Sequence, residues 1–254
     1  MSKPSTIQIS RLANVDYVTL NRPEVRNAFN EDVIAEVTAW AEGAANDPSL
    51  RGALIAGAGP SFCAGADLAW MAKMAGYTRE DNLRDARAAA AMYAAIDSLP
   101  VPVVAQIHGA ALGGGAGLAA VADIAIAAED AIFGFTEVKL GLIPAVIVPY
   151  VVAKIGRSAA RELFITGRRF DAAHARAIGL VHAVVPAAAL TDTVNKYFIE
   201  LAVNGPEAMS AAKALLREIA NLSIADAAPI TAKAIAERRV SAEAQKMIRE
   251  FLKK

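Results

Sequence analysis

The sequence predicts an α/β fold, and two observations support this prediction. Patterns typical of strands and of helices alternate along the first two thirds of the chain, which favours a largely parallel sheet covered by helices. Two short apolar runs, residues 53–56 and 103–107, each lead directly into a glycine-rich loop, as the buried strands of such sheets often do. With 254 residues, of which 55% are hydrophobic, the chain is long enough to bury a sizeable core.

The chain opens with two strand-like runs, residues 7–12 and 17–20, which are rich in β-branched side chains and are separated by polar turn residues. This pattern predicts a β-hairpin. Asn30 then has the position of a helix N-cap, because Val33 and Val37 follow it at the spacing of one helix face. We therefore expect a helix after the hairpin, with its apolar face turned to the core.

The remaining elements continue the alternation. It predicts two further helices and two further strands, at residues 68–74, 80–97, 124–127 and 132–135. Helical patterns dominate the rest of the chain, and Pro186 is a clear break. We expect two regions, an α/β core over residues 1–186 and a helical region over residues 187–254.

Composition excludes several classes of function. Basic and acidic residues both number 26, so the net charge is zero and no broad basic face for nucleic acid is expected. The single Cys63 cannot form an intramolecular disulfide, and residues 1–10 lack the pattern of a signal peptide, so we expect a cytoplasmic protein. The nearly uncharged stretch 109–122 is too short to cross a membrane, and no membrane partner is expected.

Two glycine-rich loops, residues 62–68 and 108–115, are the first candidates for chemistry. Each follows a strand, and if helices begin at Leu68 and Gly115, each loop ends at a helix N-terminus, where unpaired N–H groups suit a developing negative charge. A pair of such donors would form an oxyanion hole. The alternative is that the glycines at 113–115 only let a helix pack closely on the sheet.

Glu137 is the candidate acid/base residue. It follows a mainly apolar run, residues 133–136, where burial would raise the pKa of its carboxyl toward the range useful for proton transfer. The alternative is a solvated glutamate next to Lys139. The three histidines lack metal-ligand spacing, so no metal site is expected.

Three segments, residues 61–68, 106–118 and 133–144, resemble the enoyl-CoA hydratase/isomerase (crotonase) family in order and spacing. The resemblance extends from Val15 to the C-terminus. It implies an α/β fold of the crotonase type, a spiral of ββα units followed by a helical trimerisation region over residues 187–254. It further implies a homotrimer or a dimer of trimers that binds an acyl-CoA substrate.

The resemblance also assigns roles to individual positions. Ala66 and Gly114 match the two residues whose backbone N–H groups hold the thioester oxygen, and Glu137 matches the acid/base residue. The positions that match coenzyme A contacts are Arg26, Ala64, Asp67, Leu68, Phe251 and Lys254. In the resemblance, the last two reach the CoA of a neighbouring subunit, and no cofactor beyond the CoA moiety of the substrate is implied.

Gly117 departs from the pattern of family hydratases, which carry a first glutamate at this position. Glu137 alone must then both activate the water and supply the α-proton, or it must borrow a second group. A single glutamate is also the pattern of Δ3,Δ2-enoyl-CoA isomerases, which is the main alternative. A third possibility, an inactive CoA-binding scaffold, is disfavoured because Glu137 and both loops are present.

Residues 66–71 and 138–150 resemble bacterial methylglutaconyl-CoA hydratases of leucine breakdown. On that ground we expect hydration or dehydration of a branched, carboxylated enoyl-CoA such as 3-methylglutaconyl-CoA. Lys73, Arg79 and Arg84 follow the first loop and are candidates to face the acyl tail.

Overall fold

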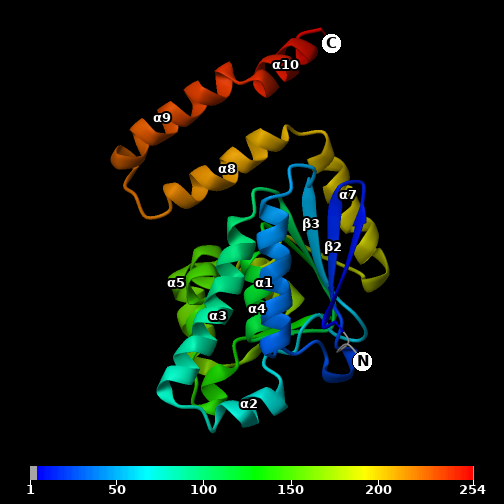
Figure 1. Ribbon diagram of the computed structural model, residues 1–254, viewed down its shortest axis with the longest axis vertical. Coiled ribbons are helices and arrows are strands. Elements are labelled where there is room, and N and C mark those ends of the chain that lie inside the picture. Colours follow the sequence, from blue (N-terminus) through cyan, green and yellow to red (C-terminus); the bar gives the residue numbers. More distant parts are fainter. Residues whose placement is uncertain (1–4, 254) are drawn as a thin grey trace.

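The computed structural model describes residues 5–253, and a six-stranded sheet forms its centre (Figure 1). In spatial order the strands are β1 (Ile7–Leu12), β2 (Val15–Leu20), β3 (Gly52–Gly57), β4 (Val103–Ile107), β6 (Ile124–Ala128) and β9 (Ala183–Val185). The first pair is antiparallel, and every other neighbouring pair is parallel. The predicted hairpin and both predicted buried strands are therefore confirmed.

A second, three-stranded sheet consists of β5 (Ala110–Leu112), β7 (Ile132–Gly134) and β8 (Arg169–Asp171). Along the chain, β4 lies in the first sheet, β5 in the second, β6 in the first and β7 in the second. Each such pair of strands is followed by a helix or by a short helical segment leading to one. Cys63 extends the second sheet through a bridge to Ala111. This alternation is the spiral of ββα units that the family resemblance implied.

The helices are α1 (Glu31–Ala45), α2 (Leu68–Met74), α3 (Arg79–Ser98), α4 (Gly114–Val121), α5 (Val148–Thr166), α6 (Ala172–Ala177), α7 (Leu190–Ala202), α8 (Pro206–Glu218), α9 (Ile224–Val240) and α10 (Ala242–Phe251). Single 3-10 turns are η1 (Pro23–Val25), η2 (Glu137–Leu140), η3 (Ala145–Ile147) and η4 (Ala187–Ala189). The Asn30 side chain accepts the Val33 N–H, which confirms the predicted N-cap. The start expected for α4 at Gly115 is one residue late.

Helices cover both faces of the large sheet. Neighbouring strand residues point to opposite faces, so Val103 and Ala105 join the main core while Val104 joins a second cluster. The main core holds the buried faces of α1 and α3, which lie side by side in Figure 1. Leu190 and Val194 of α7 complete the second cluster on the other face. Residues beyond the predicted boundary at 186 therefore contribute to the sheet packing.

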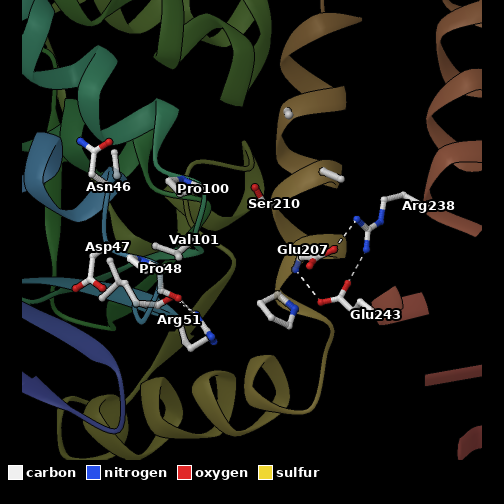
Figure 2. Close-up of a pocket in the computed structure, with 15 residues that line it drawn as sticks. Asn46, Asp47, Pro48, Arg51, Pro100, Val101, Glu207, Ser210, Arg238 and Glu243 are labelled. Carbon is white, nitrogen blue, oxygen red and sulfur yellow. Dashed lines mark hydrogen bonds and ion pairs between the residues drawn. The ribbon is translucent and has the colours of Figure 1, made fainter. Parts of the chain in front are cut away.

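Helices α8, α9 and α10 extend away from the sheets (Figure 1), and ion pairs hold them together (Figure 2). Arg238 of α9 pairs with Glu207 of α8 at 3.0 Å and with Glu243 of α10 at 2.8 Å. Glu243 also accepts the N–H groups of Glu207 and Ala208, which caps the start of α8. Within residues 5–253, no helix has the length and apolar character needed to cross a membrane.

Candidate active site

A cavity of about 650 Å³ lies between α2, α3, the start of α4 and the segment from Glu137 to Ile147. Ala66, Gly114 and Glu137 all line it. The predicted oxyanion donors and the predicted acid/base residue are thus brought together, although β4, β5, α4, β6 and β7 lie between Ala66 and Glu137 in the chain. Most of the remaining wall is apolar, with side chains from Phe29, Met74, Met92, Leu142, Ile143 and Ile147.

The two glycine-rich loops meet at Gly65 and Gly113. Both have positive φ angles, +97° and +50°, which L side chains rarely adopt. A Cβ atom on Gly113 would lie 3.9 Å from Gly65 Cα, and one on Gly65 would lie 3.1 Å from the Leu112 carbonyl oxygen. This close approach places the following residues, Ala66 and Gly114, on the same cavity wall.

The N–H groups of Ala66 and Gly114 are both available to a ligand. Phe29 donates to the Gly65 carbonyl at 2.7 Å and accepts from Asp67 N–H at 2.8 Å, so the intervening Ala66 N–H points away from Phe29. Gly114 is the first residue of α4, and its N–H has no acceptor within the helix. In the described part of the chain, no acceptor takes either N–H. Two free donors on one cavity wall are what an oxyanion hole requires, and that role stays a prediction.

Glu137 begins η2, and its carboxyl lies against this pair of loops. A Cβ atom on Gly113 would lie 3.1 Å from Glu137 Oε1, and the other oxygen, Oε2, is buried without a hydrogen-bond donor among the described residues. Burial raises the pKa of this carboxyl, against a smaller lowering effect of its own backbone N–H. The alternative of a solvated surface glutamate is therefore wrong.

Gly117 stands where family hydratases carry a first glutamate, and side chains from other elements fill the space beside it. A Cβ atom there would overlap Ile147 Cγ2 and would lie 3.1 Å from the Tyr93 hydroxyl oxygen. A second carboxylate is thus excluded by packing as well as absent from the sequence. Sequence reasoning did not single out Tyr93, because a buried aromatic residue on a helix usually indicates only core packing.

The residues expected to contact coenzyme A cluster around the first loop. Ala64 N–H donates to the Arg26 carbonyl at 2.9 Å, and Leu68 is 81% exposed. Asp67 instead supports the loop, since its carboxylate pairs with Arg22 at 2.7 Å and caps α2 through Ala69 N–H. These four contacts with CoA stay predictions.

Asp67 has a pKa that reflects this structural role. Burial alone would raise the pKa of its carboxyl, but Arg22 and the N–H groups of Ala69 and Trp70 together hold it below its ordinary value. Both carboxylate oxygens are engaged within the chain, one by Arg22 and one by the start of α2.

Phe251 lies apart from the cavity in a single chain. Phe251 ends α10 at the tip of the helical extension and is 76% exposed (Figure 1). Lys254 lies outside the described residues. The expectation that both reach a neighbouring subunit's CoA stays a prediction.

Comparison with known proteins agrees with this geometry. The family model described as enoyl-CoA hydratase/isomerase matches residues 10–254. The chain belongs to the enoyl-CoA hydratase/isomerase family. It is an enzyme of the enoyl-CoA hydratase type, and its fold is that of the crotonases.

Individual crotonases align over most of the chain. A 2,3-dehydroadipyl-CoA hydratase of Escherichia coli is 33% identical over 215 residues, covering 84% of this chain and 82% of the relative. An enoyl-CoA hydratase structure from Shewanella pealeana superposes with a TM-score of 0.94 at 35% identity, covering 98% of this chain and 93% of that one. An enoyl-CoA hydratase structure from Mycobacterium smegmatis gives a TM-score of 0.93 at 30% identity, covering 99% and 97%.

The polar groups of the crotonase cavity lie along α3 and α2. Asn82, Asp85 and Tyr93 line it from α3, and Trp70 lines it from α2 with a buried indole N–H that makes no hydrogen bond to any described residue. Burial raises the pKa of Asp85, and the nearby Trp70 partly opposes this effect. Asn82 and Tyr93 are eleven residues apart on one helix, so the cavity runs for about 16 Å along α3.

The basic side chains proposed for the acyl tail do not line this cavity. Lys73 pairs with Glu31, and Arg84 pairs with Asp81 at 2.6 Å. Arg79 is an exposed residue at the start of α3. Among the residues that the structure describes, the cavity lining contains two carboxylates, Asp85 and Glu137, and no basic side chain.

Proposed function

We propose that this cavity catalyses the reversible addition of water across the double bond of an enoyl-CoA thioester. The thioester oxygen accepts the N–H groups of Ala66 and Gly114. Glu137 takes one proton from water, the water oxygen bonds to Cβ, and the double-bond electrons move to Cα and the carbonyl as an enolate. Glu137 then returns the proton to Cα, so all atoms of water are added.

The observation that carries this proposal is the position of the buried Glu137 carboxyl beside the two unpaired N–H groups. Placing a base next to donors that stabilise the enolate is what α-proton chemistry on a thioester requires. The raised pKa of Glu137 supports both halves of its role, since the carboxylate is a stronger base and its acid form persists to higher pH. Each oxyanion donor typically contributes about 3 kcal/mol.

A second candidate, isomerisation of a 3-enoyl-CoA to a 2-enoyl-CoA, is favoured by one observation. Ile147 fills the space beside Gly117, so a single carboxylate serves the site. One base that takes a proton from Cα and returns it to Cγ suffices for an isomerase, whereas hydration also needs a group that orients water.

The charge of the cavity favours an uncharged acyl group. Asp85 and Glu137 are the only ionisable carboxylates in the described lining, and they face no lysine, arginine or histidine there. A substrate carboxylate near Asp85 would be repelled at the pH at which Asp85 is ionised. We therefore propose straight or branched uncharged enoyl groups as the preferred substrates.

A carboxylated acyl group, such as that of 3-methylglutaconyl-CoA, is the second substrate class. It is supported by the buried Trp70 N–H, which has no hydrogen-bond acceptor in the part of the chain that the structure describes and could donate to a carboxylate. It is also supported by the Escherichia coli relative, which is named for the thioester of a dicarboxylic acid.

Three substrates distinguish a hydratase of uncharged acyl groups, a hydratase of carboxylated acyl groups and an isomerase. We would follow absorbance of the conjugated thioester with crotonyl-CoA, 3-methylglutaconyl-CoA and a trans-3-enoyl-CoA. The proposal expects loss of absorbance with crotonyl-CoA, at a higher kcat/KM than with 3-methylglutaconyl-CoA. A reversed order would establish the carboxylated class, and gain of absorbance with the 3-enoyl-CoA alone would establish the isomerase. Thermal stabilisation by acyl-CoA without any turnover would indicate a binding scaffold.

We also propose that the enzyme assembles as a homotrimer or a dimer of trimers through its helical region. Large apolar side chains on α9 and α10 support this, including Ile224, Val240 and Phe251, which are all more than 70% exposed. Such side chains are usually covered in the assembled protein. Sedimentation equilibrium distinguishes a monomer, a trimer and a hexamer.

A further inference from the structure

Tyr93 occupies the wall of the cavity next to the oxyanion loop. Its side chain is 3% exposed, and its hydroxyl donates to the Gly114 carbonyl oxygen at 2.7 Å. A Cβ atom on Gly114 would lie 2.9 Å from the same hydroxyl oxygen. The Tyr93 hydroxyl is therefore in contact with the residue that supplies one of the two oxyanion donors.

The same hydroxyl lies where a side chain at Gly117 would begin. The Tyr93 oxygen is 3.1 Å from the Cβ position of Gly117, and Ile147 fills the other side of that position. A glutamate at this point of α4 would have placed a second polar group near Glu137. In this chain the polar atom at that point comes from α3 instead.

The Tyr93 hydroxyl oxygen and Glu137 Oε2 can each accept a hydrogen bond from a water molecule. Tyr93 has one hydroxyl hydrogen, which goes to Gly114, so its oxygen is left as an acceptor. Burial raises the pKa of this phenol well above its ordinary value, and the charge of Glu137 adds to the effect, so the hydroxyl stays protonated. Glu137 Oε2 is also a buried acceptor, and no donor among residues 5–253 bonds to it. A water molecule has two hydrogens to offer.

We propose that Tyr93 is the second group that holds the attacking water in hydration, in place of a glutamate at Gly117. This inference rests on the proposed hydratase function. One water hydrogen bonds to Glu137 Oε2 and is transferred as the C–O bond to Cβ forms. The other bonds to the Tyr93 oxygen and remains on the product hydroxyl, so Tyr93 orients the water without exchanging a proton.

A purely structural role for Tyr93 would have a different signature. Through the Gly114 carbonyl, Tyr93 also fixes the start of α4, and losing that support would weaken every reaction that uses the oxyanion hole. Exchange of the α-proton of a saturated acyl-CoA with solvent needs the oxyanion hole and Glu137, but it adds no water to Cβ. Comparing hydration with α-proton exchange therefore distinguishes a role of Tyr93 in orienting water from a role in supporting α4.

The test compares Tyr93→Phe with Tyr150→Phe. Phenylalanine keeps the ring of Tyr93, and Tyr150 is a matched control because its ring packs on Tyr93 at 5.9 Å but lies outside the cavity lining. We would measure hydration of crotonyl-CoA and, by NMR in D₂O, α-proton exchange of butyryl-CoA. Tyr93→Phe should lower kcat for hydration about 10- to 100-fold with a similar KM. Its exchange rate should fall much less than its hydration rate, because exchange loses only the support of α4, and both rates of Tyr150→Phe should stay near wild type.

The results that would overturn the role of Tyr93 differ from the result that would overturn the proposed function. Equal losses of hydration and exchange in Tyr93→Phe would show that Tyr93 only supports α4, and unchanged hydration would show that it does not hold the water. Either result overturns the inference while the hydratase function stands. Exchange without hydration in the wild-type enzyme would instead overturn the proposed function itself, and with it the role of Tyr93.

Discussion

At the scale of single residues, Glu137 links activity to stability. Its carboxyl is half-buried in a mainly apolar cavity, and Oε2 is buried with no donor among the described residues, so its charged form is less well solvated than in the unfolded chain. The same burial that prepares it for proton transfer therefore costs folding free energy whenever the group is ionised. Function and stability should respond in opposite directions when this charge is removed.

Glu137→Gln should lower kcat for hydration about 10²- to 10⁴-fold, because the acid/base group is lost while the oxyanion donors remain. Acyl-CoA binding should be retained. In wild type, kcat/KM should rise with pH through the raised pKa of Glu137, since hydration uses the carboxylate. Glu129→Gln, a change at an exposed glutamate, is the matched control. Full activity of Glu137→Gln would contradict the assignment.

The same variant predicts an effect on stability. A carboxyl whose pKa is raised on folding contributes stability that is present below the unfolded pKa and is lost as pH rises through the folded pKa. At neutral pH, Glu137→Gln should therefore have a higher Tm than wild type. The difference should shrink as pH falls below about 4, where both states are protonated. Thermal unfolding followed by circular dichroism across this range measures it.

At the scale of elements, the start of α4 is built for close approach. Gly113 adopts a positive φ against Glu137, Gly115 lies against Cys63, and Gly117 lies against Ile147 of η3. These glycines let three neighbouring segments contact the helix backbone directly. The alternative that they only allow close packing is therefore partly correct, since the same packing also brings the Gly114 N–H to the cavity.

Gly117→Ala should lower the free energy of unfolding by about 1–3 kcal/mol, because the new methyl overlaps Ile147 Cγ2. Ile147→Ala removes buried side-chain volume and destabilises on its own, but it should cost less in the Gly117→Ala background than in wild type, so the two changes should be non-additive. Gly43→Ala is the control, since a Cβ atom there meets nothing within 4 Å in α1, and it should stabilise by about 0.5–1 kcal/mol. Urea unfolding measures all four. A neutral Gly117→Ala would contradict the packing.

At the scale of the whole molecule, an ion pair and a hydrogen bond from Lys213 connect the helical extension, α8 to α10, to the core. Lys213 of α8 pairs with Asp123 at 2.6 Å and donates to the Val101 carbonyl at 2.8 Å. Asp123 also accepts the N–H of Val103, the first residue of β4. This site connects α8 to the edge of the main core at the start of a central strand.

Lys213→Met should lower the free energy of unfolding by about 1–3 kcal/mol, because it leaves the partly buried Asp123 without its cation. Lys233→Met is the control, since its pair with Glu237 is exposed and 3.8 Å long, and it should change stability by less than about 0.5 kcal/mol. Chemical denaturation at fixed protein concentration compares them. Equal effects of the two changes would show that the Lys213–Asp123 ion pair stabilises the fold no more than an exposed pair does.

The sequence by itself determined the features that depend on local order. The hairpin, the Asn30 cap, the strand-to-glycine loops and Glu137 in an apolar run could all be predicted, because periodicity and capping act between residues close together in the chain. The family resemblance added the spiral and the pairing of Ala66 with Gly114.

Only the tertiary structure decided which distant residues share a wall of the cavity. Tyr93 beside Gly117, Ile147 in place of a glutamate side chain, and the ion pair that occupies Asp67 all join segments separated by at least 24 residues. Such contacts depend on how successive turns of the spiral stack, and no local pattern records that geometry. The absence of basic side chains from the described cavity lining also depends on tertiary structure, because Lys73 and Arg84 form ion pairs outside the cavity.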